Sequence, residues 1–393
     1  MTKPVSVTLV LGAAPYQSAL AAKLMSAGML RQLIEVVPNL EIHELDDEGN
    51  LERVRTFPEF ALMKRVAWGI WRRLPANTRP PMMLNAWLAD RLTASRIAPC
   101  KIFHSCTAIC LASLRAAKQQ GALTLVESAS CHPREWIKVE MEEAARFGAS
   151  SRDSSGSHTE RMLRRMEREF EECDRIVVPS QVARRSFTEH GYSEKTVMVQ
   201  TGVDAEFFSP SAAVAPQETT FRVCYVGRVE FSKGVGYLLE AWKRLGLAGA
   251  ELVLVGELRP QIQSLLKSYE NCGVRLAGIL PPGEVARCYR ELGLFVMPSL
   301  NEGLAQVLLE AMASGLPVVA TDRTGASDCI ENGKGGLIVP ARDVDALADA
   351  ILWCYEHREQ SRAMGRAARA RIESEYTLEH YNERVIQMYR SLV

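Results

Sequence analysis

The chain has 393 residues and a formal net charge of zero, with 47% hydrophobic and 24% charged residues. This length predicts two domains, and the composition is that of a globular protein rather than a disordered or fibrous one. The balanced charge excludes a uniform attraction to nucleic acid, and no apolar run approaches the roughly 18 residues of a membrane-spanning helix.

The cysteines and the first residues bear on the cellular compartment. Ten cysteines occur without a C-x-x-C pair. We therefore expect reduced thiols in a cytoplasmic protein, and neither a disulfide framework nor a zinc site. Residues 1–15 hold too short an apolar run for a signal peptide and are predicted to begin with a strand.

Short apolar runs alternate with amphipathic stretches in the first half, which is typical of stacked β-α units. The expected strands are Val5–Leu11, Lys101–His104, Leu123–Glu127 and Arg175–Pro179. The expected helices are Tyr16–Ala27, Ala108–Gln119, Glu160–Glu172 and Gln181–His190.

Small residues and prolines interrupt the alternation at Thr201–Thr220, which predicts a linker. The pattern then restarts, and after Asp343 the chain is predicted to be helical to its end. Near-continuous apolar strands are expected when helices cover both faces of a parallel sheet. We therefore predict an α/β protein of two doubly wound domains that bind ligand in the cleft between them, beyond the carboxyl ends of the strands. The strands expected in this half are Arg222–Gly227, Glu251–Gly256, Val274–Ala277, Leu294–Pro298, Pro317–Thr321 and Gly336–Val339.

A basic segment follows the first strand of the second half, in "YVGRVEFSKGVG", Tyr225–Gly236. The strand ends at Gly227, and Lys233 and Gly234 open a helix. Free amides and the positive dipole at a helix N-terminus, with Arg228 and Lys233 beside them, suit a phosphate or diphosphate. The alternative is a strand-to-helix turn whose two cations are merely solvated.

Two glutamates occur in "NEGLAQVLLEAMASG", Asn301–Gly315, where a helix from Gly303 to about Ala313 is expected. Eight helical positions separate Glu302 from Glu310, which places both carboxylates toward one cleft with a rise of about 12 Å. Carboxylates accept paired hydrogen bonds from neighbouring hydroxyls, so one could hold a hexose and the other a ribose. Alternatively, Glu302 stabilises the helix dipole and Glu310 is a surface residue.

A third segment, Leu276–Val285, places a Pro-Pro-Gly loop after a strand. Backbone groups near Ile279 could contact a nucleobase, although a tight turn explains the same residues.

Together these segments make the second half similar to a known family, the retaining glycosyltransferases of family 4 (glycosyl transferases group 1), which have the GT-B fold. The resemblance rests on Arg228, Lys233, "PSLNEGLAQVLLEAMASGLPVVATD" at Pro298–Asp322, and a Gly-Val-Asp linker at Thr201–Pro210. It covers residues 181–393 well and the first half loosely.

The resemblance implies roles for individual residues of the second half. Arg228 and Lys233 would bind the donor diphosphate, Glu302 the transferred sugar, and Glu310 the ribose. Backbone amides would add contacts to sugar or phosphate from Gly303, Leu304 and Ala305.

In the first half the resemblance implies fewer contacts. Gly12 would offer a backbone contact to donor or acceptor. His132, just after a strand in "VESASCHPREW", would face the sugar, which adds it to Arg228, Lys233 and Glu302 as a catalytic residue. The alternative for His132 is a loop histidine held by its neighbours.

The resemblance also implies a domain plan and an activity. Residues 1–205 would form a Rossmann-like acceptor domain and residues 206–375 a nucleotide-sugar domain, with a helix at 376–393 packed back on the first. A hexosyltransferase would move sugar from a nucleoside-diphosphate sugar to a glycan or lipid-linked hydroxyl in surface polysaccharide synthesis, with retention.

We expect no cofactor and no metal. The basic residues and a helix N-terminus would stabilise the departing diphosphate in place of a metal ion. Asp343 and Asp345 form an Asp-x-Asp pair, but they open a helix, where an N-cap is the ordinary explanation.

Two other functions stay open on the sequence. One is a nucleotide-sugar epimerase or hydrolase on the same fold. The other is a non-catalytic protein that binds a nucleotide.

The stretch Phe60–Leu92, residues 60–92, interleaves basic residues with tryptophans and methionines. It predicts contact either with an anionic membrane surface, at the inner face, or with a lipid-linked acceptor. The alternative is an insertion whose aromatic residues pack on the first domain.

Overall fold

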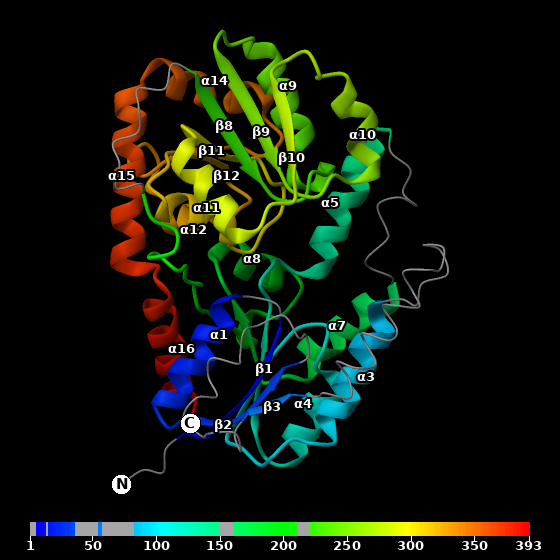
Figure 1. The fold of residues 1–393 in the computed structure, drawn as a ribbon. Helices are drawn as coiled ribbons and strands as arrows, with labels where there is room; N and C mark the ends of the chain where they lie inside the picture. Colours follow the sequence, from blue (N-terminus) through cyan, green and yellow to red (C-terminus); the bar gives the residue numbers. More distant parts are fainter. Residues whose placement is uncertain (1–4, 13–14, 36–53, 57–81, 149–159, 211–219) are drawn as a thin grey trace.

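The computed structural model describes residues 5–12, 15–35, 54–56, 82–148, 160–210 and 220–393. They form two α/β domains, one above the other in Figure 1, each built on a parallel sheet. The predicted fold class, two doubly wound domains of the GT-B type, is confirmed.

The first domain has a seven-stranded sheet in the order β3-β2-β1-β4-β5-β6-β7. Every described pairing in it is parallel. Chain order reverses between β1 and β4, so the carboxyl ends of these two strands flank the crevice in which such sheets bind ligands. The strands are β1 (Val7–Leu11), β2 (Leu30–Glu35), β3 (Val54–Thr56), β4 (Ile102–Cys106), β5 (Leu123–Glu127), β6 (Arg175–Val178) and β7 (Thr196–Met198).

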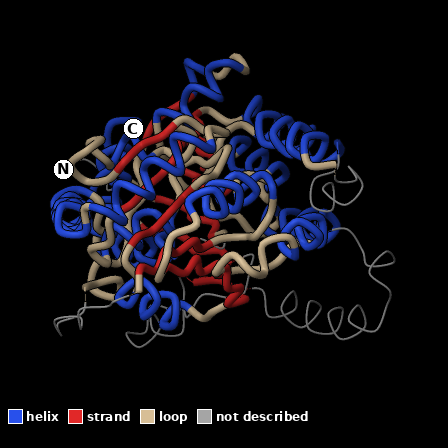
Figure 2. Tube along the Cα trace, turned by 90° about the horizontal axis from the view of Figure 1, so that it is seen from above, coloured by secondary structure: helices blue, strands red, loops and turns tan. Residues whose placement is uncertain are grey.

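Helices cover both faces of this sheet, and the view in Figure 2 shows the strands of the molecule in its interior with helices around them. One face packs against α1 and the C-terminal helix, and the other against α4, α7 and α8. The helices of the domain are α1 (Pro15–Ser26), α3 (Met82–Ala94), α4 (Leu111–Gln119), α5 (Pro133–Arg146), α7 (Glu160–Glu172), α8 (Gln181–Glu189) and the 3-10 turn η3 (Ser193–Lys195).

The second domain has a six-stranded sheet in the order β10-β9-β8-β11-β12-β13, again with parallel pairing. The chain order reverses between β8 and β11. The loops that follow these two strands therefore meet at the ligand-binding edge. The strands are β8 (Phe221–Val226), β9 (Ala250–Val255), β10 (Val274–Gly278), β11 (Leu294–Met297), β12 (Val318–Thr321) and β13 (Leu337–Val339).

Two apolar clusters fill the two faces of this sheet. One packs beneath α11, α12 and α15, and the other beneath α9, α10 and α14. The helices are η4 (Phe231–Lys233), α9 (Val235–Leu245), α10 (Pro260–Lys267), α11 (Pro282–Glu291), α12 (Gln306–Ala313), α13 (Ala326–Cys329), α14 (Val344–Glu356), α15 (Arg358–Glu375) and α16 (Leu378–Leu392).

The chain passes between the domains at two points that lie together. The Val203 amide donates to the Tyr376 carbonyl at 2.9 Å, and the Leu378 amide donates to the Val203 carbonyl at 3.1 Å. A Cβ on Gly202 would lie 2.3 Å from the Thr377 carbonyl oxygen, so only glycine permits this approach. Beyond the crossing, α16 packs on α1 and the first sheet (Figure 1).

The strands predicted from apolar runs are all present, within one or two residues. The helix predicted from Ala108 begins instead at Leu111. The reason is local: the amides of Ala108 and Cys110 donate to the buried carboxylate of Glu169, at 2.5 and 3.0 Å, and Ala108 has a φ of 76°. Residues 108–110 therefore stay in the loop, and the helix begins only after them. Strands β2, β3 and β7 and helices α3 and α5 were not predicted.

The segment predicted either to touch a membrane or to pack as an insertion is only partly described, because residues 57–81 lie outside the described part. From position 87 on, Ala89 is buried and Leu92 packs against the core of the first domain, although neither is one of the aromatic residues that the insertion alternative expects to pack there. Trp87 is 40% exposed and lies under the Arg91 guanidinium. In the described part of the chain, no helix has the length and apolarity to cross a bilayer. The ten cysteines are free thiols.

Candidate functional site

The basic segment after β8 folds as a turn that positions Arg228. Gly227, with a φ of 151°, lies against the corresponding Gly256 after β9, where a Cβ would be 1.9 Å from the Gly227 carbonyl oxygen. The Tyr225 hydroxyl donates to the Arg228 carbonyl at 2.7 Å. The Arg228 guanidinium lies 3.2 Å from Glu230. The turn thus places Arg228 at the edge of the sheet where the carboxyl ends of the strands lie. Its guanidinium is paired there with the Glu230 carboxylate.

Lys233 ends the turn η4, and Gly234 caps helix α9, as predicted. Gly234 has a φ of 70°, and a Cβ there would lie 1.9 Å from the Pro298 carbonyl oxygen. The close approach brings the N-terminus of α9 against the end of β11, where the glutamate loop begins. A helix N-terminus at this edge offers unpaired amides to an anion.

Lys233 and Glu302 form an ion pair, with 2.5 Å between Nζ and Oε1. Both side chains are only 16% exposed. They come from the loops after β8 and β11, the two strands between which the chain order reverses. The structure therefore brings these two predicted residues into contact at the ligand-binding edge.

The helix predicted to begin at Gly303 was placed too early. Helix α12 begins at Gln306, and Glu302 lies in the loop before it. The loop uses its backbone on neighbouring segments: the Glu302 amide donates to the Arg323 carbonyl and the Ala305 amide to the Thr324 carbonyl. The 12 Å helical rise expected between the glutamates therefore does not apply.

The amides of Gly303 and Leu304 differ from that of Ala305. Within the described residues, neither amide donates a hydrogen bond. The amide contact predicted for Ala305 is less favourable, because that amide donates to Thr324. Two amides of the three thus remain able to bind an anion.

Loops of the first domain reach this glutamate loop. The Ser180 hydroxyl donates to the Gly303 carbonyl at 2.5 Å, and the Cys131 thiol donates to the Glu302 carbonyl at 3.2 Å. A Cβ on Gly303 would lie 2.2 Å from the Ala129 carbonyl oxygen. The two domains are therefore in contact immediately beside Glu302.

Glu310 lies on α12 in a separate environment. Its carboxylate is half-buried and accepts a hydrogen bond from the Tyr289 hydroxyl at 3.3 Å. Burial raises the pKa of Glu310 to about 7. Among the described residues no contact joins Glu310 to Glu302 or Lys233, so the structure does not bring the two glutamates together directly.

Ile279 follows β10 at the same edge of the second sheet. Its side chain is 76% exposed, and the preceding Gly278 has a φ of 72°. An exposed apolar surface at a strand end is compatible with the predicted base contact. The Gly278 carbonyl already accepts from the Gly256 amide.

Gly12 ends β1 in the first domain. Its amide donates to the Gln17 side chain at 2.8 Å, and the Gln17 side-chain amide donates to the buried Glu127 carboxylate at 3.1 Å. A Cβ at Gly12 would lie 2.9 Å from the Cys106 sulfur. The Gly12 amide is therefore engaged inside the domain, and a donor or acceptor contact through that amide is not supported.

His132 caps helix α5 and lies inside the first domain. Its ring stacks on His190 at 3.9 Å and packs near Phe170 and Phe187. The residue is 1% exposed, and the buried Nε2 atom has no hydrogen-bond partner among the described residues. Burial and the neighbouring His190 lower the pKa of His132 to about 4. The ring has no exposed nitrogen directed at the cleft, so the sugar contact predicted for His132 is not supported.

Two charged residues at this edge were not predicted to be part of the site. Glu230, which is almost fully buried, lies between Arg228 and Arg259, whose guanidinium is 3.7 Å away. Arg259 precedes α10, and the Arg259 amide donates to the Val229 carbonyl. A cation in the loop after β9, directly before a proline at the helix start, is the signal that could have placed Arg259 beside Arg228.

The Asp-x-Asp pair behaves as the N-cap interpretation predicted, because the Asp343 carboxylate accepts from the Ala346 amide at 2.9 Å. In the part of the chain that the structure describes, no group of three or more His, Cys, Asp or Glu side chains is arranged to hold a metal ion.

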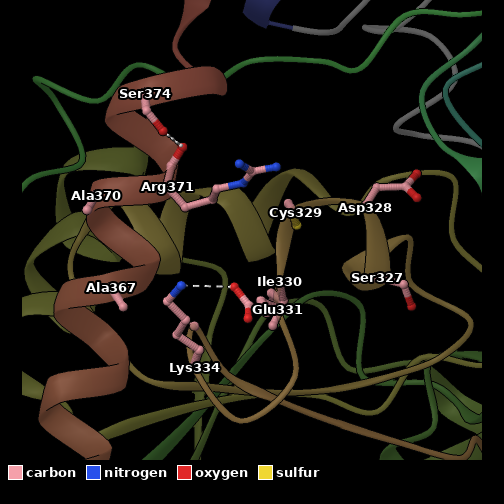
Figure 3. Close-up of a pocket in the computed structure, with 11 residues that line it drawn as sticks. Ser327, Asp328, Cys329, Ile330, Glu331, Lys334, Ala367, Ala370, Arg371 and Ser374 are labelled. Carbon is pink, nitrogen blue, oxygen red and sulfur yellow. Dashed lines mark hydrogen bonds and ion pairs between the residues drawn. The ribbon is translucent and has the colours of Figure 1, made fainter.

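A pocket of about 650 Å³ lies away from these residues, between α13 and α15. Figure 3 shows Lys334 paired with Glu331 on its wall, and Arg371 extending from α15. Asp328, also on its wall, accepts from the Gln181 amide of the first domain at 2.6 Å. None of the residues predicted for the site lines this pocket.

The whole chain is similar in structure to known GT-B glycosyltransferases. A sucrose-phosphate synthase from Thermosynechococcus elongatus matches with a TM-score of 0.71 and 22% identity, over 99% of each chain. Anabaena HepE, in complex with UDP and glucose, matches with a TM-score of 0.66 and 15% identity, over 98% of this chain and 100% of that one. These similarities establish the fold.

The sequence comparison bears on the second domain. Residues 220–357 match the family model "Glycosyl transferases group 1". This range, about a third of the chain, holds Arg228, Lys233, Glu302 and Glu310, so the second domain is similar to that family.

Curated relatives match over part of their length. An amylovoran biosynthesis glycosyltransferase from Erwinia amylovora is 31% identical over 47% of this chain and 48% of its own. A putative colanic acid biosynthesis glycosyltransferase from Escherichia coli is 28% identical over 51% of this chain and 52% of its own. The matched part of the chain thus spans about half the length of these relatives.

Proposed function

We propose that the protein is a retaining glycosyltransferase that moves a sugar from a nucleoside-diphosphate sugar to a hydroxyl acceptor. The observation that carries the proposal is the Lys233–Glu302 ion pair. It lies where the chain order of the second sheet reverses, and the first domain closes over it. A donor that enters there would exchange this pair for two substrate contacts, diphosphate to Lys233 and sugar hydroxyl to Glu302.

The catalytic problem for such an enzyme is the departing nucleoside diphosphate. Negative charge develops on its oxygens as the glycosidic bond breaks. Arg228, Lys233 and the two free amides at Gly303 and Leu304 form a preorganised set of cations and dipoles for that charge. No metal is required in this scheme.

The acceptor hydroxyl would approach from the side of the leaving diphosphate, which gives retention at the anomeric carbon. A diphosphate oxygen would take the hydroxyl proton. Glu310, with Tyr289 as its hydrogen-bond donor, would hold the ribose, and the exposed surface at Ile279 would lie under the base.

The named relatives suggest the acceptor class. Amylovoran and colanic acid, which appear in their names, are polysaccharides, so we propose a glycan or lipid-linked saccharide in surface polysaccharide synthesis. We also propose a cytoplasmic enzyme in peripheral contact with the membrane through residues 60–92. Flotation with anionic liposomes at low salt tests that contact, and a lack of binding there would exclude it.

The first test is a thermal-shift screen with UDP-, GDP-, ADP- and dTDP-sugars. One donor should raise the unfolding temperature of the wild type, because a ligand that binds only the folded state stabilises it. Lys233→Ala should lose most of that shift, whereas Lys267→Ala, an exposed lysine on α10, should keep it. Equal shifts in both variants would remove Lys233 from the site.

Product analysis separates the alternatives. A transferase gives glycosylated acceptor. An epimerase or hydrolase changes the donor sugar without an acceptor. A non-catalytic protein binds nucleotide and gives no product, and calorimetry without nucleoside diphosphate binding would contradict the proposed function.

A further inference from the structure

Helix α5 starts in the first domain and ends on the second. Its first residues follow the His132 cap inside the first domain. Beyond its end, Phe147 stacks on Phe231 of η4, with ring centroids 4.5 Å apart and planes 7° apart. A Cβ on Gly236 would lie 2.6 Å from the tip of the Phe147 ring. Figure 1 shows α5 alongside the second domain.

Polar and apolar contacts fix this docking. Val139 packs with Tyr237 and Leu300 in a small cluster of its own. The Tyr237 hydroxyl donates to the buried Glu143 carboxylate at 2.8 Å, and the Arg342 guanidinium binds Glu143 at 2.7 Å. The backbone of α5 is therefore held on both sides of position 140.

Glu140 lies within this docked part of the helix and is half-buried. Helix α5 packs against η4, the turn that ends at Lys233, and the charge of Glu140 interacts with three cations of the second domain, which we name the cation cluster: Arg228, Lys233 and Arg259. In the described part of the chain it forms no hydrogen bond or ion pair with any of them, although it interacts with them electrostatically. Glu230, which pairs with Arg228 and Arg259, is a fourth charged group whose charge interacts with that of Glu140. Glu143 lies about one helical turn further along α5.

The charges around the cation cluster indicate a function for the Glu140 carboxylate. Three cations held together in a partly buried site repel one another unless anions compensate them. Without donor, the carboxylates of Glu140, Glu230 and Glu302 compensate the cation cluster. A donor diphosphate brings its own negative charge to the same place, so one of the carboxylates is then in excess.

Glu140 is the carboxylate best placed to change its charge. Glu230 and Glu302 are paired with cations at short range, whereas Glu140 is not. Burial and the nearby Glu230 raise the pKa of Glu140 to about 7, so its proton affinity is already high near neutral pH.

We infer that Glu140 is the first domain's counter-charge for the donor site, and that donor binding is coupled to uptake of one proton by its carboxylate. This inference rests on the proposed function and adds a positioning residue to it. The proton neutralises the carboxylate, and no other bond forms or breaks.

The experiment is calorimetry between pH 6.5 and 8.5 with UDP, GDP, ADP or dTDP, whichever belongs to the donor that shifts the unfolding temperature. Wild-type affinity should fall by up to about tenfold for each pH unit above 7, because binding consumes a proton. Glu140→Gln keeps the shape without the charge, so its affinity should vary less with pH and exceed that of the wild type at pH 8.5. Glu142→Gln, which makes the same charge change on the same helix, should follow the wild type.

Other titrations cancel in this comparison, because Glu310 and the nucleotide itself are the same in all three proteins. Titrations in buffers of different ionisation enthalpy should show more proton uptake by the wild type than by Glu140→Gln. If Glu140→Gln does not fold, Glu140→Ala takes its place, with the same expected pH profile. Equal pH profiles and proton uptake would overturn the inference and leave the proposed function intact. No binding of UDP, GDP, ADP or dTDP by any of the proteins would overturn both.

Discussion

Gly303→Ala should separate the domains without damaging either of them. Its Cβ would lie 2.2 Å from the Ala129 carbonyl oxygen and 2.9 Å from Cγ of Pro179, both in the first domain. A carbon and an oxygen that are not bonded approach to roughly 3.3 Å, so the two loops must move apart by about 1 Å. Gly303 has no positive φ, so alanine adds no backbone strain of its own.

A displacement of this size matters because the glutamate loop and the first domain must close on the same substrate. A misplacement of about 1 Å can cost roughly 10²-fold in turnover. We therefore expect Gly303→Ala to lower kcat about 10²-fold, while nucleotide binding by the second domain changes much less.

Two measurements check this expectation. Small-angle scattering of the ligand-free protein should give a larger radius of gyration for Gly303→Ala than for the wild type, and a coupled assay of nucleoside diphosphate release should give the lower kcat. Gly283→Ala is the matched control, because nothing lies within 4 Å of a Cβ at that position. Wild-type scattering and wild-type kcat in Gly303→Ala would refute the reasoning.

Three further predictions concern the charges of the site. Arg228→Ala and Lys233→Ala should each lower turnover by about 10²-fold, the scale of one lost preorganised stabiliser; near-normal turnover in both, with intact folding, would contradict their role. The raised pKa of Glu310, about 7 against an ordinary 4.5, means that the folded state binds this proton more tightly, so stability is lost as pH rises through that interval. Glu310→Gln should thus match the wild type near pH 5 and exceed its free energy of unfolding at pH 8 by about 2 kcal/mol; urea titrations that give the same difference at both pH values would disprove this. Turnover should be complete in EDTA, and strict dependence on an added divalent ion would show that a metal takes part.

The sheets could be predicted from sequence where burial on both faces makes strands into continuous apolar runs. This holds for β8 to β13 and for β1, β4, β5 and β6. Strand β2 was missed because it includes Gln32, whose buried side chain bonds the backbone of Arg96 and Ala98. Strands β3 (VRT) and β7 (TVM) have three residues each and include a polar residue, so they form no continuous apolar run, whereas the equally short β13 (LIV) is entirely apolar.

Helix α5 was missed for a related reason. Its buried side includes the carboxylate of Glu143, which is satisfied by Tyr237 and Arg342, residues of the other domain. A hydrophobic periodicity cannot show a buried face built from charged groups. The same limit applies to the site: the sequence indicated Lys233 and Glu302, but their pairing depends on two loops that meet only in the folded sheet.

The two hydrogen-bonded crossings at Val203 and Thr377 have a mechanical consequence. Because both covalent links between the halves pass through one place, they act as a single pivot. In Figure 1 the passage from α15 to α16 and the docked helix α5 lie at opposite margins of the molecule. Rotation about this pivot would therefore separate the two domains most beside α5, where the Phe147 ring stacks on Phe231, and would break that stack first.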